Sequence, residues 1–183
     1  PTLTPAQAER GHRAVTEMCD YLRTLVAARR QAPGDPERDV LTRLIQGEAD
    51  GEQLSEVELL QNCIFLLNAG HETTTNLIGN GLILLQEFPA ARALLLADLQ
   101  ATASDAAAQE QVLTLAVDEC LRFESSNQLG NRRTLKATQV GGVDLPEGAL
   151  VTLCIGAANR DPVQFPDPET LDLRRATNKH LAF

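Results

Sequence analysis

The chain has 183 residues, of which 43% are hydrophobic, so it is long enough to bury a core and to form one globular domain. Its 16 Lys and Arg stand against 25 Asp and Glu, and the net charge of −9 argues against nucleic acid or an anionic membrane surface as the main partner. We find no signal peptide and no run of about eighteen apolar residues, which predicts a cytoplasmic protein that does not enter a membrane. The four cysteines include no CxxC pair, so we expect neither a disulfide framework nor a zinc site.

Apolar residues at helical spacing predict helices over most of the first two thirds of the chain. The pattern covers residues 5–30, a shorter segment at 40–45 that ends near 49–51, and a long segment at 55–86 that opens with a capping box of Ser55 and Glu58. Two further helices are expected, one that opens at Pro89 and one over 106–123. The long helix, at about 1.5 Å per residue, crosses a whole domain.

The composition changes after residue 124, where glycines and prolines separate short apolar segments. Strands are predicted at residues 134–140, 143–145 and 149–155, and the rest is rich in loops. The predicted fold class is therefore mainly α with a small antiparallel β region. We expect a single partial domain over 1–183, helical over 1–124 and rich in strands and loops over 125–183.

A polar cluster, A-G-H-E-T-T-T at residues 69–75, interrupts the apolar pattern of the long helix, which otherwise has the composition of a buried helix. The HExxH zinc motif is excluded because Thr75, and not a histidine, stands four residues after His71. Two interpretations stay open. Glu72 and Thr73 either relay protons into a pocket, or they belong to a buried polar cluster whose hydrogen bonds are merely satisfied.

Two other sets of charged residues are candidates for a site. Glu119 and Arg122 stand one helical turn apart, either as an exposed ion pair or as a partly buried pair with a further partner. Arg132 and Arg133 either hold a carboxylate or phosphate or lie on a solvated strand edge.

Three motifs, in this order along the chain, resemble those of the cytochrome P-450 haem monooxygenases. Residues 69–74 are similar to the oxygen-activation motif of the long central helix of that family, and Glu119 with Arg122 resembles its ExxR pair. A-N-R-D-P at 158–162, followed by F-P-D-P at 165–168, resembles the segment before its haem loop. The resemblance covers essentially the whole chain, which is similar to the C-terminal part of a soluble bacterial member, and it implies a partial cytochrome P-450 fold.

The resemblance also implies roles for individual residues. Glu72 and Thr73 would be catalytic and deliver protons to bound dioxygen, Arg132 would pair with a propionate of the haem (heme) cofactor, and Glu119 and Arg122 would be structural. The pocket for substrate and oxygen would be lined by Ala69, Gly70, Gln128 and Leu129.

The sequence departs from the family at the iron ligand. In the family, a cysteine in a Phe-Gly-x-Gly-x-His-x-Cys-x-Gly loop follows a segment like H-L-A-F at 180–183, and none of the four cysteines here matches it. We therefore expect no metal ligand in this chain, no retention of haem by the chain alone, and no activity of the chain alone. P-E-T-L at 168–171 also lacks the arginine of the family's Pro-x-Arg-Phe segment, for which Arg174 and Arg175 are candidates.

The expected parent protein is a monooxygenase that inserts one oxygen atom from O2 into a small organic substrate, with electrons from a ferredoxin or a reductase. The alternative is a non-catalytic helical scaffold or interaction module derived from the same fold. Exposed apolar surface would then favour self-association.

Overall fold

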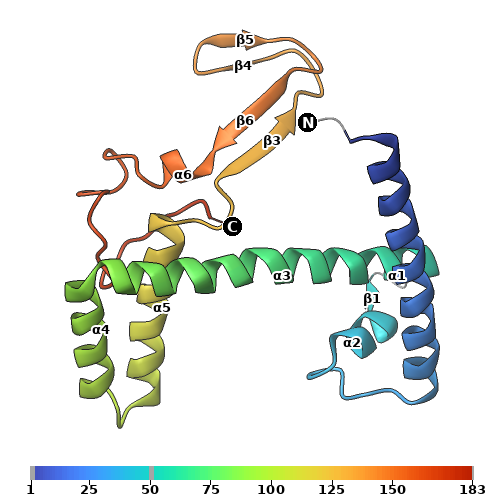
Figure 1. The fold of residues 1–183 in the computed structure, drawn as a ribbon, viewed down its shortest axis with the longest axis horizontal. Coiled ribbons are helices and arrows are strands. Elements are labelled where there is room, and N and C mark those ends of the chain that lie inside the picture. Colours follow the sequence, from blue (N-terminus) through green and yellow to red (C-terminus); the bar gives the residue numbers. More distant parts are fainter. Residues whose placement is uncertain (1–2, 50–51, 183) are drawn as a thin grey trace. The chain divides into compact units, whose positions relative to one another are not determined.

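The structure, a computed structural model, describes residues 3–49 and 52–182 (Figure 1). It divides into two compact units, Pro1–His71 and Glu72–Phe183, and the boundary falls inside the long helix α3 (Glu56–Glu87). Helices with small antiparallel sheets form both units, which confirms the predicted fold class. Among the described residues, no helix combines the length and the apolar character that a membrane span requires.

The first unit begins with helices α1 (Pro5–Gln31) and α2 (Val40–Gln46). Their apolar faces meet the start of α3, where Leu22, Val26, Leu59 and Leu60 are buried together. Asp39 caps α2 through the backbone N–H of Leu41, and its pKa is lowered chiefly because the Thr42 hydroxyl donates a hydrogen bond to it. These contacts close a small core around the first third of the chain.

Strands β1 (Glu48–Ala49) and β2 (Glu52–Gln53) pair antiparallel between α2 and α3. The sequence placed the end of the second helix near residues 49–51, whereas α2 ends at Gln46. Asp50 and Gly51 lie outside the described residues.

Helix α3 starts as predicted, with a capping box. The backbone N–H of Ser55 donates to Glu58 Oε2 at 2.9 Å, and that of Glu58 donates to Ser55 Oγ at 3.3 Å, so the pKa of Glu58 lies below its usual value. The helix then continues without interruption to Glu87, directly before Phe88 and Pro89.

The prediction that α3 is buried is wrong for most of its length. Phe65, Ile78 and Leu82 are 61–67% exposed, and Leu67 and Ile83 are more than half exposed. Apolar side chains point to all sides of this helix, and a helix of that kind needs neighbours on all sides. In the described structure, only the two ends of α3 have such neighbours. Leu59 and Leu60 pack in the core of the first unit, and Leu84 packs in the core of the second.

The second unit packs the end of α3 against helices α4 (Pro89–Ala101) and α5 (Ala106–Phe123). The Phe88 and Phe123 rings meet edge to face, with 5.4 Å between their centroids. The buried core of this unit is formed by Leu84, Ala116, Cys120, Phe123, Leu171 and Leu173. Part of the loop-rich tail is thus a component of the core.

Two antiparallel strand pairs follow α5. Strand β3 (Leu129–Arg133) pairs with β6 (Leu150–Cys154), and β4 (Thr138–Val140) pairs with β5 (Val143–Leu145) around two glycines with positive φ. A short helix, α6 (Ile155–Ala158), comes directly after β6. The predicted strand over 134–140 is therefore wrong in its first half, and β3 precedes it.

The physical reason for this error is that β3 has no apolar alternation. Its residues L-G-N-R-R are mostly exposed, and the strand is defined by its backbone pairing with β6. Thr134 then turns the chain, because its hydroxyl donates to the Pro146 carbonyl at 2.6 Å.

Candidate active site

The most ordered polar group of the second unit is the pair of Glu119 and Arg122 near the end of α5. Both side chains are fully buried, and two parallel hydrogen bonds of 2.8 Å join the guanidinium to the carboxylate. The alternative of an exposed ion pair is therefore wrong. A buried ion pair is tolerable only where other groups satisfy the remaining donors and acceptors, so its further partners matter.

Three backbone carbonyls accept the remaining hydrogen bonds of Arg122. Its Nη1 donates to Asn159 at 2.9 Å and to Pro168 at 3.0 Å, and its Nη2 donates to Thr170 at 3.2 Å. The arginine thereby connects α5 to two segments some forty residues further along the chain. The side chain thus holds backbone from these segments together and is fully buried.

Glu119 has its own further partners, all from the tail. Its oxygens accept from the backbone N–H of Asp172 at 2.9 Å, from Arg175 Nε at 3.0 Å and from Asn178 Nδ2 at 3.1 Å. Of the two arginines that the sequence offered as a third partner, Arg175 takes the place. Arg174 instead forms a forked pair with Asp98, which lowers the pKa of that carboxyl.

Sequence reasoning missed two residues of this region, Asn159 and Arg160, although both lie in the A-N-R-D-P segment. Asn159 is fully buried and hydrogen-bonded to Ser125 and to the backbone of Leu181. The Arg160 guanidinium lies 3.7 Å from the centroid of the Phe123 ring and donates to the Phe123 carbonyl, while it also pairs with Glu169. The available signal was a polar run directly after an apolar strand.

The polar side chains in the middle of α3 are more exposed than Glu119 and Arg122. Glu72 is exposed and Thr73 is half-buried, and neither Thr73 nor His71 is without an interaction partner. A Cβ atom built on Gly70 would meet no other group within 4 Å. The boundary between the two units follows His71, so Ala69 and Gly70 belong to the first unit, and Glu72 and Thr73 belong to the second.

Gln128 and Leu129 lie where the chain enters β3. The Gln128 amide donates to the Ser125 carbonyl at 2.8 Å, and its side chain covers Gly156, where an added Cβ would overlap the amide. Leu129 is 58% exposed. The Gln128 side chain is therefore held in place, and the Leu129 side chain is open to a ligand.

Arg132 lies in the middle of β3 with an exposed side chain. Among the described residues its one hydrogen-bond partner is the carbonyl of Asn131, to which Nη1 donates at 2.9 Å. A guanidinium has five N–H donors, so most of them can bind a carboxylate such as a haem propionate. The residue fits the role that the resemblance implies.

Among the cysteines, Cys120 is buried and Cys63 is half-buried. Burial, with a smaller contribution from Glu119, raises the pKa of Cys120 to about 11, and burial also raises the pKa of Cys63. Both are neutral thiols near pH 7. Within residues 3–49 and 52–182, no group of three or more His, Cys, Asp or Glu side chains could hold a metal ion. Neither Cys63 nor Cys120 lies in the ligand motif that the family uses.

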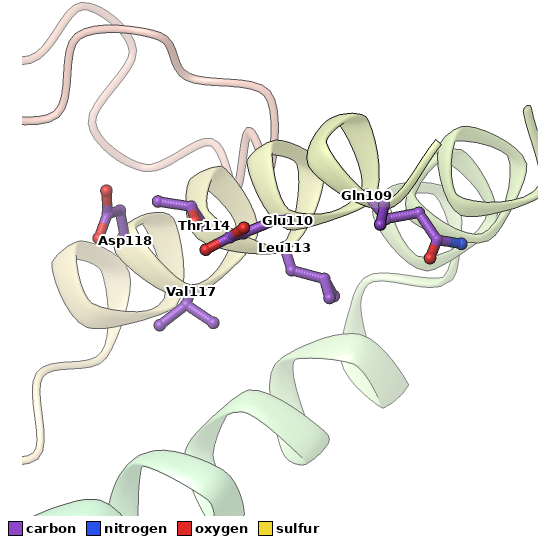
Figure 2. Close-up of a pocket in the computed structure, with 7 residues that line it drawn as sticks. Gln109, Glu110, Leu113, Thr114, Val117 and Asp118 are labelled. Atoms are coloured by element: carbon purple, nitrogen blue, oxygen red, sulfur yellow. The ribbon is translucent and has the colours of Figure 1, made fainter. Parts of the chain in front are cut away.

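A shallow hollow lies along one face of α5 (Figure 2). The labelled side chains that line it are Gln109, Glu110, Leu113, Thr114, Val117 and Asp118. None of the candidate site residues belongs to it, so it is not the substrate pocket that the sequence suggested.

Comparison with known proteins identifies the family. The sequence profile of the family described as Cytochrome P-450 matches residues 2–181. Cytochrome P-450 107B1 of Saccharopolyspora erythraea is 41% identical over 179 residues, which are 97% of this chain and 41% of that protein. The 6-deoxyerythronolide B hydroxylase of the same organism is 37% identical over 182 residues, 99% of this chain and 42% of that protein.

The fold agrees with a solved structure of the same family. The ligand-free structure of cytochrome P-450 TbtJ1 superposes with a TM-score of 0.82 at 37% identity, over 99% of this chain and 44% of that one. The chain thus spans about two fifths of the length of the relatives it matches. A match of this extent to the family profile, with the buried ExxR pair in place, shows that the chain belongs to the cytochrome P-450 family.

Proposed function

We propose that this chain works as part of a haem-thiolate monooxygenase that inserts one oxygen atom from O2 into a small organic substrate. The observation that carries the proposal is the saturated network of Glu119, Arg122 and Arg175 in a member of this family. A network of buried charges is retained where it orders segments around a site. A relative that is named as a hydroxylase supports the same class of reaction.

Bound haem would supply the activation of dioxygen. Arg132 binds one of its propionates, because its exposed guanidinium is available on β3. Glu72 and Thr73 hold and pass protons at the carboxylate and hydroxyl oxygens, and Gly70 leaves the side of α3 open for oxygen and substrate.

Leu129 offers apolar contact to the substrate, and Gln128 shapes the wall beside it. Leu129 is exposed at the start of β3, while the Gln128 amide is fixed by the Ser125 carbonyl. Ala69 on α3 is proposed as a further substrate contact on the family resemblance alone. A small organic substrate follows from these mostly small and apolar groups.

The thiolate is proposed to come from the family's Phe-Gly-x-Gly-x-His-x-Cys-x-Gly loop, which does not occur within these 183 residues. The chain by itself is therefore inactive. Electrons are supplied by a ferredoxin or a reductase, and the protein works in the cytoplasm.

A second candidate function is favoured by the exposed apolar side chains of α3. Phe65, Ile78 and Leu82 are each more than 60% exposed, which is typical of a surface that associates. The chain would then be a helical scaffold that self-associates. Sedimentation at several concentrations tests this, because a scaffold remains a defined oligomer, whereas a chain that lacks its neighbours aggregates without a defined size.

The monooxygenase proposal is tested with the gene extended through the cysteine loop. Glu72→Gln and Thr73→Ala should each lower product formation by roughly two orders of magnitude, the usual contribution of proton transfer, and should leave haem binding unchanged. Thr24→Ala is the matched control, because it deletes a threonine hydroxyl from helix α1, which carries none of the proposed site residues. Full product formation in both α3 variants would contradict the assigned roles.

A further inference from the structure

Asn159 is a fully buried amide whose Nδ2, Oδ1 and backbone carbonyl each take part in a hydrogen bond. Its Nδ2 donates to Ser125 Oγ at 2.8 Å, and its Oδ1 accepts from the backbone N–H of Leu181 at 2.7 Å. Its backbone carbonyl accepts from Arg122 Nη1 at 2.9 Å. One residue therefore joins the end of α5, the end of α6 and the tail.

The chemistry of this position requires a group that both donates and accepts. The one hydrogen of the Ser125 hydroxyl goes to the Leu121 carbonyl at 2.8 Å, so toward Asn159 this oxygen acts as an acceptor. The N–H of Leu181 needs an acceptor. A side-chain amide offers both at the right separation, while a carboxylate offers only acceptors and an aliphatic side chain offers neither.

Among the described residues, the tail makes few other hydrogen bonds near Leu181. Near it, Asn178 donates to Glu119 at 3.1 Å, and the N–H of Ala182 donates to His180 Nδ1 at 3.3 Å, within the tail itself. The 2.7 Å bond from Leu181 to Asn159 is shorter than either. It ties the tail backbone to the same groups that surround Arg122.

We propose that Asn159 is a positioning residue that transmits the geometry of the Glu119 and Arg122 pair to the backbone at Leu181. In the protein of the proposed function, this would fix the backbone that leads into the family's cysteine loop. The proposal rests on the proposed function only for its last step. The coupling between Asn159 and Leu181 stands on the contacts above.

The test uses the protein with the cysteine loop, two Asn159 variants and two control variants. Asn159→Leu keeps the approximate size and removes both the donor and the acceptor, so the Leu181 N–H loses its partner. We expect the Leu181 amide to exchange its hydrogen roughly tenfold faster, the factor that one hydrogen bond represents. The reduced, carbon monoxide-bound spectrum should then show a mixture of thiolate-ligated and other haem. Asn159→Ser, neutral and shorter, repeats the test if the first variant does not fold.

Two variants serve as controls. Ser125→Ala removes the other partner of the amide and leaves the Leu181 bond, so it should lower stability without changing the spectrum. Asn62→Leu makes the same chemical change in the first unit, where the amide donates to the Glu58 carbonyl at 2.8 Å, and should change neither readout.

Unchanged exchange at Leu181 in the Asn159 variants would overturn the proposal, and so would a spectral change of equal size in Ser125→Ala. A wild-type protein that shows no thiolate spectrum would refute the proposed function. The exchange measurement would still decide the role of Asn159.

Discussion

The end of α5 and the middle of α3 carry the two polar motifs of this chain, and the two motifs differ in how deeply their side chains are buried. At the end of α5, Glu119 and Arg122 are fully buried, and every partner comes from the second unit. In the middle of α3, Glu72 and the apolar residues around it are exposed. The polar group at the end of α5 is therefore completed by partners within its own unit, whereas the apolar side chains in the middle of α3 have no comparable cover among the described residues.

Among the substitutions that test this comparison, removal of Arg122 should have the largest effect on stability. Arg122→Ala leaves the Glu119 carboxylate buried without its main partner and should destabilise the chain by about 3–5 kcal/mol. Urea denaturation followed by circular dichroism measures the loss. Arg23→Ala, which breaks an exposed pair with Asp20, should change the same midpoint little. Equal losses in the two variants would mean that the buried network does not hold the second unit together.

The next largest effects on stability are expected at the two neighbouring arginines of the tail, Arg174 and Arg175. Arg175→Ala removes a nearly buried donor to Glu119 and should cost about 1–3 kcal/mol. Arg174→Ala removes an exposed pair with Asp98 and should cost much less. Thermal melting of both variants decides between them, and a larger loss for Arg174→Ala would contradict the assignment of Arg175 as the third partner.

A smaller effect is expected where Gln128 covers Gly156. Gly156→Ala places a methyl group within 2.9 Å of Gln128 Cδ, so the amide must leave and lose its bond to the Ser125 carbonyl, at a cost of about 1 kcal/mol. In a Gln128→Ala background the same substitution should be nearly neutral. Additive free energies of unfolding in this double-mutant cycle would show that the two residues do not interact.

The smallest effect concerns the Cys120 thiol, whose pKa burial raises to about 11. Because the folded state favours the neutral thiol, its stabilisation is complete below the ordinary pKa of 9.0 and is lost as the pH rises through about 11. Alkylation at pH 8 should therefore label exposed Cys154 and spare Cys120. Mass spectrometry reads the labels, and equal labelling would contradict the burial of Cys120.

The helices were predictable because their signals are local. Ser55 with Glu58 starts α3 as expected, and Phe88 with Pro89 ends it. The burial of α3 was not predictable from the same signals, since an apolar helix is buried only if the covering segments are present. Strand β3 was missed for a related reason, because its exposed Asn131 and Arg132 carry no pattern and its partner β6 lies about twenty residues away.

The candidate site was likewise only partly predictable from the sequence. The spacing of Glu119 and Arg122 places them on one helix face, but their full burial depends on carbonyls from Pro168 and Thr170, which no periodicity reveals. Asn159 could not be predicted as a site residue because its hydrogen-bond partners Arg122, Ser125 and Leu181 are distant from it in sequence. Roles for Glu72, Thr73 and Arg132 come from the family resemblance, and they stay proposals.

The central claim is that this chain carries the haem scaffold of a cytochrome P-450 without its thiolate ligand. The most direct measurement is the optical spectrum of the purified chain after haem is added and then reduced under carbon monoxide. We predict no Soret band of the thiolate-ligated type, because none of the four cysteines lies in the family's ligand motif. A thiolate-type band would contradict the account and show that one of these cysteines binds the iron.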